Sequence, residues 1–194
     1  MNEKLKKNIT IIILAAGQSK RFKKDKIFFD INGISVAENT LQTISKLEFI
    51  DSVIVVCSET NKSKFDDLLS KNFFTNKNIY TTIGSNTRGG SLIQGLKFSK
   101  QLKTKFDCII VQDVARPFTS KDMYLKGLEA LKKNDAVVFG LQPTDTVKMV
   151  DKNNFVVKTL DRNTLMNIQT PQFFQAKILF KNINFKINQY LNLI

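Results

Sequence analysis

The chain has 194 residues, of which 42% are hydrophobic, and 30 Lys+Arg against 17 Asp+Glu give it a formal net charge of +13. This composition predicts one globular domain over 1–194 and excludes a chain that is disordered throughout. The sequence contains no histidine, which excludes a Ser-His-Asp triad, a histidine general base and a His-ligated metal.

The positive charge is carried almost entirely by lysine. Only four basic residues are arginine: Arg21, Arg88, Arg116 and Arg162. Proteins that bind nucleic acid use arginine heavily, because its planar fork makes paired hydrogen bonds to phosphate and guanine. The scattered lysines therefore argue against a nucleic-acid partner and indicate compositional drift in a chain rich in Lys, Asn and Ile.

The two cysteines and the apolar segments indicate the cellular compartment of the protein. Cys57 and Cys108 lie in the apolar runs VIVVC and DCIIV, which predicts buried strand residues in a reducing compartment. The longest apolar run, 9–17, is about half of the roughly 20 residues that a membrane span needs, and polar residues follow it. We therefore expect a cytoplasmic protein without a membrane segment.

Strand and helix patterns alternate along the chain. Apolar runs predict strands at 11–16, 51–57, 79–83, 106–113 and 135–141. The run at 11–16 is continuous, as expected for a strand buried on both faces, and 51–57 is a second buried strand. Apolar residues at helical spacing predict helices at 35–47, 60–69, 91–102 and 120–132. Ser91 and Ser120 are the candidate N-caps of the last two helices. TVKMV and FVVKTL around DKNN predict a β-hairpin, and the tail from Ala176 is helix-like.

This alternation predicts an α/β fold with a mostly parallel sheet covered on both faces. Ligands of such sheets bind at the carboxyl ends of the strands. The rule selects the loops after Ala16, Cys57, Ile83 and Val111 as candidate binding loops.

The first of these loops belongs to the segment LAAGQSKRFKKDK at 14–26. Small residues after a buried strand let the backbone approach a ligand, and successive backbone N–H groups cradle phosphates. Arg21 and Lys26 follow within the same loop, so both cations can reach one triphosphate. The segment matches neither a Walker A loop nor GxGxxG, and a tight turn with solvated lysines is the structural alternative.

Two further segments place polar groups at the same edge. In GSNTRGGSLIQGL (84–96), the glycines and Ser91 indicate a helix N-terminus that favours anions, with an ordinary capped turn as the alternative. In VQDVARPF (111–118), Asp113 ends a buried strand, where a carboxylate needs a metal, a hydroxyl or a cation. Arg116, three residues on, is the candidate partner for a purely structural ion pair.

All four arginines fall inside or beside the candidate binding loops, with Arg162 in LDRNTL beyond the hairpin. Three loop-borne cations and one aspartate suit nucleotidyl transfer. In that reaction a substrate phosphate attacks the α-phosphate of a nucleotide, Mg2+ bridges oxygens, and cations stabilise the developing charge.

The motifs together resemble a known family. LAAGQSKRF with Lys26, GSNTRGGSLIQGL, VQDVARPF, PTDTVK, LDRNTL and QTPQFF occur in the order and near the spacing of bacterial 2-C-methyl-D-erythritol 4-phosphate cytidylyltransferases, from about Ile9 to Phe174. The ribitol 5-phosphate cytidylyltransferases are similar and form the alternative, together with an inactive nucleotide-binding remnant. The resemblance implies a Rossmann-like three-layer nucleotidyltransferase sandwich with a hairpin dimer arm at 144–160.

The resemblance also implies substrates and site residues. CTP would be held through the backbone of Ala15, Ala16 and Gly17, and its base and ribose would be read by Gly84, Ser85 and Ser91. Arg21 and Lys26 would be catalytic and would stabilise the pentacoordinate α-phosphate. Asp113 would contact the ribose and Mg2+.

The second substrate would be a polyol phosphate, methylerythritol phosphate. The residues implied to hold it are Arg116, Thr146, Arg162 and Thr170. The arm would form a homodimer, so that Arg162 serves the site of the neighbouring subunit. The attacking phosphate is already an anion, so this reaction requires no enzyme base.

The chain departs from the family pattern in several places. Ser19 replaces a loop glycine, the loop before Lys26 is short, and Ser85-Asn86 replaces a usual Gly-Asp. The sequence ends soon after QTPQFF, where the family continues with a TD(D/E)A segment and an NIKxT element. The resemblance therefore implies a chain that is C-terminally truncated relative to the family.

Overall fold

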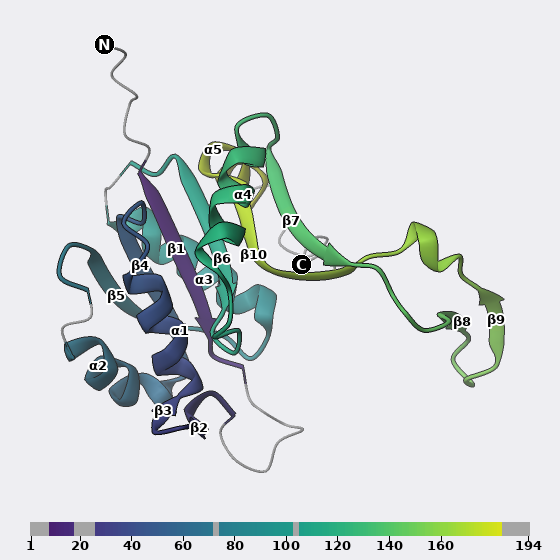
Figure 1. The fold of residues 1–194 in the computed structure, drawn as a ribbon, viewed down its shortest axis with the longest axis horizontal. Coiled ribbons are helices and arrows are strands. Elements are labelled where there is room, and N and C mark those ends of the chain that lie inside the picture. Colours follow the sequence, from purple (N-terminus) through teal and green to yellow (C-terminus); the bar gives the residue numbers. More distant parts are fainter. Residues whose placement is uncertain (1–7, 18–25, 72–73, 103–104, 184–194) are drawn as a thin grey trace.

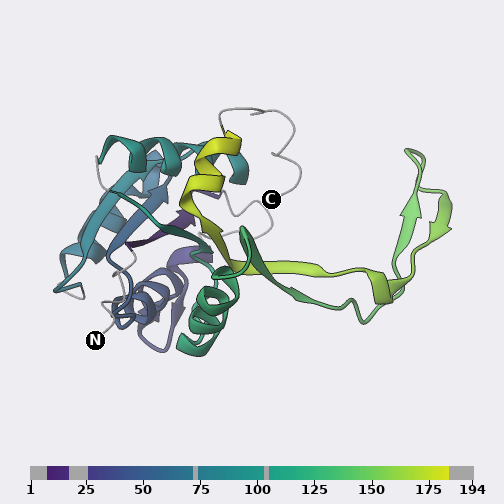
Figure 2. The ribbon, with the colours of Figure 1, turned by 90° about the horizontal axis from the view of Figure 1, so that it is seen from above.

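The computed structural model describes residues 8–17, 26–71, 74–102 and 105–183. They form a six-stranded sheet in the order β5-β4-β1-β6-β10-β7, with helices on both faces (Figure 1, Figure 2). The strands are β5 (Asn78–Ile83), β4 (Ser52–Cys57), β1 (Ile9–Ala15), β6 (Cys108–Asp113), β10 (Asn167–Gln175) and β7 (Ala136–Leu141). All neighbours pair in parallel except β10, which runs antiparallel to both β6 and β7. The predicted mostly parallel sheet is confirmed.

The helices divide between the two faces of the sheet. They are α1 (Val36–Ser45), α2 (Lys62–Ser70), α3 (Arg88–Gln101), α4 (Lys121–Leu131) and α5 (Ala176–Ile183), with short 3-10 turns at η1 (Lys26–Phe28), η2 (Glu59–Asn61) and η3 (Arg162–Thr164). Alternate residues of β1 point to opposite faces. Ile11 and Ile13 pack with α1, α2 and α4, whereas Ile12 and Leu14 pack with α3 and α5. The result is a three-layer arrangement.

The helix starts test the predicted caps. Ser120 caps α4 by accepting a hydrogen bond from the Met123 N–H, as predicted. The predicted cap at Ser91 is wrong: α3 begins three residues earlier, and Thr87 caps it by accepting from the Gly90 N–H at 3.0 Å. The glycine pair misled the prediction because it lies inside the first turn. A Cβ on Gly90 would come within 2.6 Å of the Ser85 hydroxyl, so glycine serves close packing there.

Strand β10 was not predicted from the sequence. Its polar residues interrupt the apolar run, and Pro171 stands inside it. The register against β7 shifts between Gln169 and Gln172, around that proline, which is the position in a strand where a residue without an N–H is tolerated. This strand brings Thr170 beside Asp113, the last residue of β6.

The predicted hairpin is confirmed by β8 (Lys148–Val150) and β9 (Val156–Thr159), which pair antiparallel. A second small hairpin joins β2 (Asp30–Ile31) to β3 (Ile34–Ser35). The β8–β9 hairpin projects away from the main sheet (Figure 2). We call the whole connection between β7 and β10, residues 142–166, the arm; it includes the dimer arm expected at 144–160. Several of its apolar side chains are exposed, with 71% of Phe155 and 60% of Val156 accessible.

Both cysteines lie in the core, as predicted, and neither forms a disulfide. Burial raises the pKa of the Cys57 thiol, and the nearby Asp66 carboxylate raises it further. No helix within the described ranges is long and apolar enough to cross a membrane.

We expect neither thiol to react with Ellman's reagent in the native protein, because only an accessible thiolate attacks the reagent. Both thiols should react once denaturant unfolds the chain. A Ser70→Cys variant, which adds a thiol at the exposed end of α2, serves as the positive control. Rapid labelling of the native wild-type protein would contradict the buried placement.

Candidate functional site

The loops after β1 and β5 meet at the carboxyl edge of the sheet. Gly84, the first residue after β5, donates a hydrogen bond to the Cys57 carbonyl at 2.8 Å. A Cβ on Gly84 would lie 2.6 Å from the Ala16 Cβ and 2.8 Å from the Ser91 Oγ. Glycine is therefore required for the two predicted nucleotide loops to touch.

Gly84→Ala should lower the free energy of unfolding by about 1–3 kcal/mol, the usual cost of overpacking, and should also weaken nucleotide binding. Urea unfolding and calorimetry with CTP measure the two effects. Gly17→Ala is the matched control, because a Cβ there meets no described atom within 4 Å and stability should not change. Equal stability of the two variants would disprove the close approach at Gly84.

Ser91 is buried and its hydroxyl is fully engaged by its own loop. Its Oγ accepts from the Ser85 N–H at 3.0 Å and lies within 3.0 Å of the carbonyl oxygens of Ser85 and Thr87. Ser85 itself is exposed. Ser91 therefore fixes the backbone of the predicted nucleotide loop from its buried side, whereas Ser85 is on the solvent-exposed side of the loop.

Asp113 ends β6 between two arginines. Its Oδ1 accepts a hydrogen bond from the Arg88 Nε at 3.2 Å, and its Oδ2 lies 3.8 Å from the Arg116 Nε. Its backbone N–H donates to the Thr170 Oγ1 at 3.2 Å. The ion pair predicted with Arg116 is present, but the nearer partner is Arg88, to which the sequence analysis gave no role.

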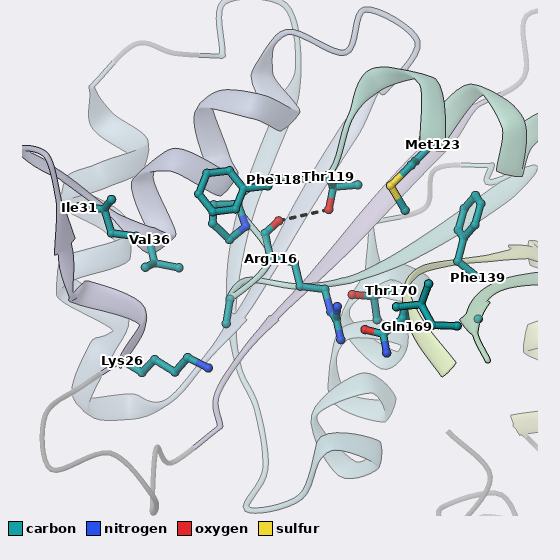
Figure 3. A pocket seen from close by; sticks show the side chains of 14 residues that line it. Lys26, Ile31, Val36, Arg116, Phe118, Thr119, Met123, Phe139, Gln169 and Thr170 are labelled. Atoms are coloured by element: carbon teal, nitrogen blue, oxygen red, sulfur yellow. Dashed lines mark hydrogen bonds between the residues drawn. The ribbon is translucent and has the colours of Figure 1, made fainter. Parts of the chain in front are cut away.

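A cavity of about 580 Å³ opens beside this cluster (Figure 3). Lys26 reaches toward it from one side, and the guanidinium of Arg116 lies on the other side beside Gln169 and Thr170. Apolar side chains, among them Met123 and Phe139, form part of the wall. The structure therefore brings together Lys26, Arg116 and Thr170, which are distant in sequence.

The loop that carries Arg116 is held from below by Gln112, a fully buried residue of β6. The Gln112 side-chain amide donates to the Arg116 carbonyl at 3.4 Å and to the Thr119 hydroxyl at 3.1 Å. Thr119 in turn donates to the same carbonyl at 3.2 Å. Sequence reasoning missed Gln112, although a polar residue inside an apolar strand was the available signal.

Two predicted site residues lie elsewhere in the chain's own fold. Thr146 is exposed on the arm, and Arg162, in η3, donates from its Nη1 to the Thr144 carbonyl at 2.7 Å. Both lie in the connection between β7 and β10, and neither lines the cavity. Arg21 lies outside the described residues.

The side chains at the carboxyl edge of the sheet decide whether this site could bind a metal ion. Within the described ranges, no group of three or more His, Cys, Asp or Glu side chains could hold a metal. Mg2+ in nucleotide sites is commonly bound by one or two carboxylates together with substrate phosphates. Asp113 supplies one carboxylate at the right edge, so the residues fit an ion that binds together with a nucleotide.

A mostly parallel sheet with close-packed loops, two cations and an aspartate at its carboxyl edge defines an α/β nucleotide-binding protein of the nucleotidyltransferase type. The profile of the family described as IspD, 2-C-methyl-D-erythritol 4-phosphate cytidylyltransferase, matches residues 9–192. The chain belongs to this family.

Individual relatives agree with the family match. The protein of that name from Clostridium tetani is 34% identical over 193 residues, which cover 98% of this chain and 76% of the relative. The one from Fusobacterium nucleatum is 33% identical over 185 residues, covering 93% and 78%. The crystal structure of 4-diphosphocytidyl-2C-methyl-D-erythritol synthase from Anaerococcus prevotii is similar with a TM-score of 0.77 at 33% identity, covering 96% of this chain and 78% of that one. The predicted fold class is confirmed.

Proposed function

We propose that this chain joins CTP and 2-C-methyl-D-erythritol 4-phosphate to give 4-diphosphocytidyl-2-C-methyl-D-erythritol and pyrophosphate, a step of isoprenoid precursor biosynthesis by the non-mevalonate pathway. Membership of the family over 9–192 supports this reaction and favours this acceptor over ribitol 5-phosphate. The observation that carries the proposal is the cavity at the carboxyl edge, where Lys26, Arg116 and Thr170 converge beside Asp113.

The chemistry is a displacement at phosphorus. An oxygen of the acceptor phosphate bonds to the α-phosphorus of CTP, and the bond from that phosphorus to the bridging oxygen of the β-phosphate breaks. The electron pair leaves with pyrophosphate. Because the acceptor phosphate is already an anion, no base is needed, in keeping with a chain that lacks histidine.

The nucleotide would lie over the contact between the β1 and β5 loops. The backbone of Ala15, Ala16 and Gly17 would face its phosphates, and Gly84 and Ser85 would face its base and ribose. Arg21 and Lys26 would stabilise the negative charge that spreads over the α-phosphate during the reaction. Asp113 would hold the ribose and share Mg2+, which when bound neutralises triphosphate charge.

The acceptor would occupy the cavity, with its phosphate on Arg116 and Thr170. We propose that the second pair of acceptor contacts, Thr146 and Arg162, comes from the arm of a partner copy in a homodimer. The exposure of apolar arm residues supports this arrangement, because such patches mark interaction surfaces. A cytoplasmic location is also proposed, supported by two cysteines that form no disulfide.

Pyrophosphate release tests the proposal, with CTP and Mg2+ and each acceptor in turn. Turnover with methylerythritol phosphate, and none when ATP or UTP replaces CTP, is the expected result. Turnover with ribitol 5-phosphate alone would overturn the acceptor. CTP binding in a calorimeter without turnover on any acceptor would instead identify an inactive nucleotide-binding protein.

A further inference from the structure

Arg88 is the one arginine that the proposed reaction leaves without a role. It is the first residue of α3, directly after the Thr87 cap. Its Nε donates to Asp113 Oδ1 at 3.2 Å, and its Nη2 lies 3.5 Å from Gln172 Oε1. One guanidinium therefore links α3, β6 and β10 at the edge where the ligands would bind.

The setting of Arg88 shows that it is not an ordinary surface cation. Its Nη1 is shielded from solvent and none of the described residues accepts a hydrogen bond from it, while its partner Gln172 is only 6% exposed. A cation in the first turn of a helix opposes the helix dipole at a cost of about 0.3–1 kcal/mol. Stability of α3 therefore does not explain the residue.

The choice of arginine in a lysine-rich chain is also informative. A planar fork can satisfy a carboxylate and an amide oxygen at the same time, whereas the single ammonium of lysine cannot hold both in fixed directions. Arg88 meets this condition with Asp113 and Gln172. The position requires the geometry of the guanidinium and not its charge alone.

Asp113 has a second guanidinium within reach, which creates a competition. The Arg116 Nε is 3.8 Å from Asp113 Oδ2, longer than the 3.2 Å contact with Arg88. Arg116 also lines the cavity proposed for the acceptor phosphate. If the Asp113 carboxylate turned fully to Arg116, it would no longer point toward the nucleotide. It would also neutralise the Arg116 guanidinium, which would then bind the acceptor phosphate less well.

We infer that Arg88 is a positioning residue that holds the Asp113 carboxylate for the nucleotide and thereby leaves Arg116 free for the phosphate of the acceptor. The inference rests on the proposed function. It assigns the two arginines beside one aspartate to different tasks: Arg88 acts through Asp113, and Arg116 contacts the substrate.

Arg88→Gln tests the first half of this division. Loss of a charged hydrogen bond to Asp113 should lower kcat/KM for CTP by about ten- to a hundredfold, and calorimetric CTP affinity should fall in parallel. Arg88→Lys should recover only part of the loss. Unchanged CTP affinity in a folded Arg88→Gln protein would overturn the inference.

The second half of the inference, that Arg88 leaves Arg116 free for the acceptor, predicts that a second substitution restores acceptor binding. In Arg88→Gln the released carboxylate pairs with Arg116, so the KM for methylerythritol phosphate, measured at saturating CTP, should rise. Adding Asp113→Asn removes the competing charge, and the acceptor KM should return to that of Asp113→Asn alone. A purely structural role would leave the acceptor KM raised in the double variant and would lower the melting temperature of every Arg88 variant.

Calorimetry with CTP separates this inference from the function on which it rests. A wild-type protein that binds CTP without turnover would refute the proposed function, while the loss of CTP affinity in Arg88→Gln would still support the hold on Asp113. A wild-type protein that binds no CTP would overturn both.

Discussion

Lys26→Ala should lower kcat by about a hundred- to a thousandfold, the effect of removing one preorganised group that stabilises transition-state charge. Lys26 opens η1, is exposed and faces the cavity opposite Arg116 (Figure 3). Its loss removes a positive charge from the proposed α-phosphate position without creating a cavity in the core. The melting temperature should therefore stay unchanged, and pyrophosphate release under saturating substrates measures the loss.

The control must remove a lysine of equal charge elsewhere. Lys132→Ala does so at the end of α4, beside Ile9 and Cys108 and thus at the opposite end of the sheet. Its kcat should match wild type. Arg21→Ala should resemble Lys26→Ala, as the resemblance to the family implies. Near-wild-type turnover in Lys26→Ala would remove that lysine from the catalytic group.

Mixing two inactive variants should restore activity if the arm completes the site of a partner. Arg116→Ala damages the cavity of its own chain, and Arg162→Ala damages the arm that the chain would lend. A mixed dimer then has one site with both defects and one site with neither. Random mixing would make half of the dimers mixed, so about a quarter of all sites would be intact in a symmetric dimer.

The two variants should be unfolded and refolded together so that subunits exchange, and the pyrophosphate assay then compares the mixture with each variant alone. Arg162→Ala mixed with Thr146→Ala is the control: both defects lie on the arm, and each mixed dimer has one altered arm per site, so activity should not recover. If Arg116→Ala and Arg162→Ala also fail to complement, each site is built within one chain.

The buried strands were the part of the fold that the sequence predicted best. Runs such as Ile11–Leu14 and Val53–Val56 are apolar at every position because the sheet is covered on both faces. β10 could not be predicted in the same way, because polar residues interrupt its apolar pattern. Gln169 and Thr170 line the cavity, and Thr170 and Gln172 accept hydrogen bonds from Asp113 and Arg88.

The site was predictable in its motifs but not in its pairings. Small residues and cations after strands identified the right edge of the sheet, and the structure places Lys26, Arg116 and Thr170 there. The link from Arg88 to Asp113 joins positions 25 apart in sequence, and periodicity carries no information on such contacts. The pair Gly89-Gly90 indicates a loop from the sequence alone, whereas the fold places it in the first turn of α3 and packs Gly90 against Ser85.

The strand order shows that the pairing of the main sheet does not depend on the arm. β7 and β10 are antiparallel neighbours, and Leu141 faces Asn167 across them, so the two strands alone form an ordinary β-hairpin whose connection happens to be 142–166. Antiparallel partners need only a tight turn of about two residues. The long excursion is thus an insertion into a finished sheet, and its length, sequence and choice of partner can diverge without altering a single strand pairing of the body.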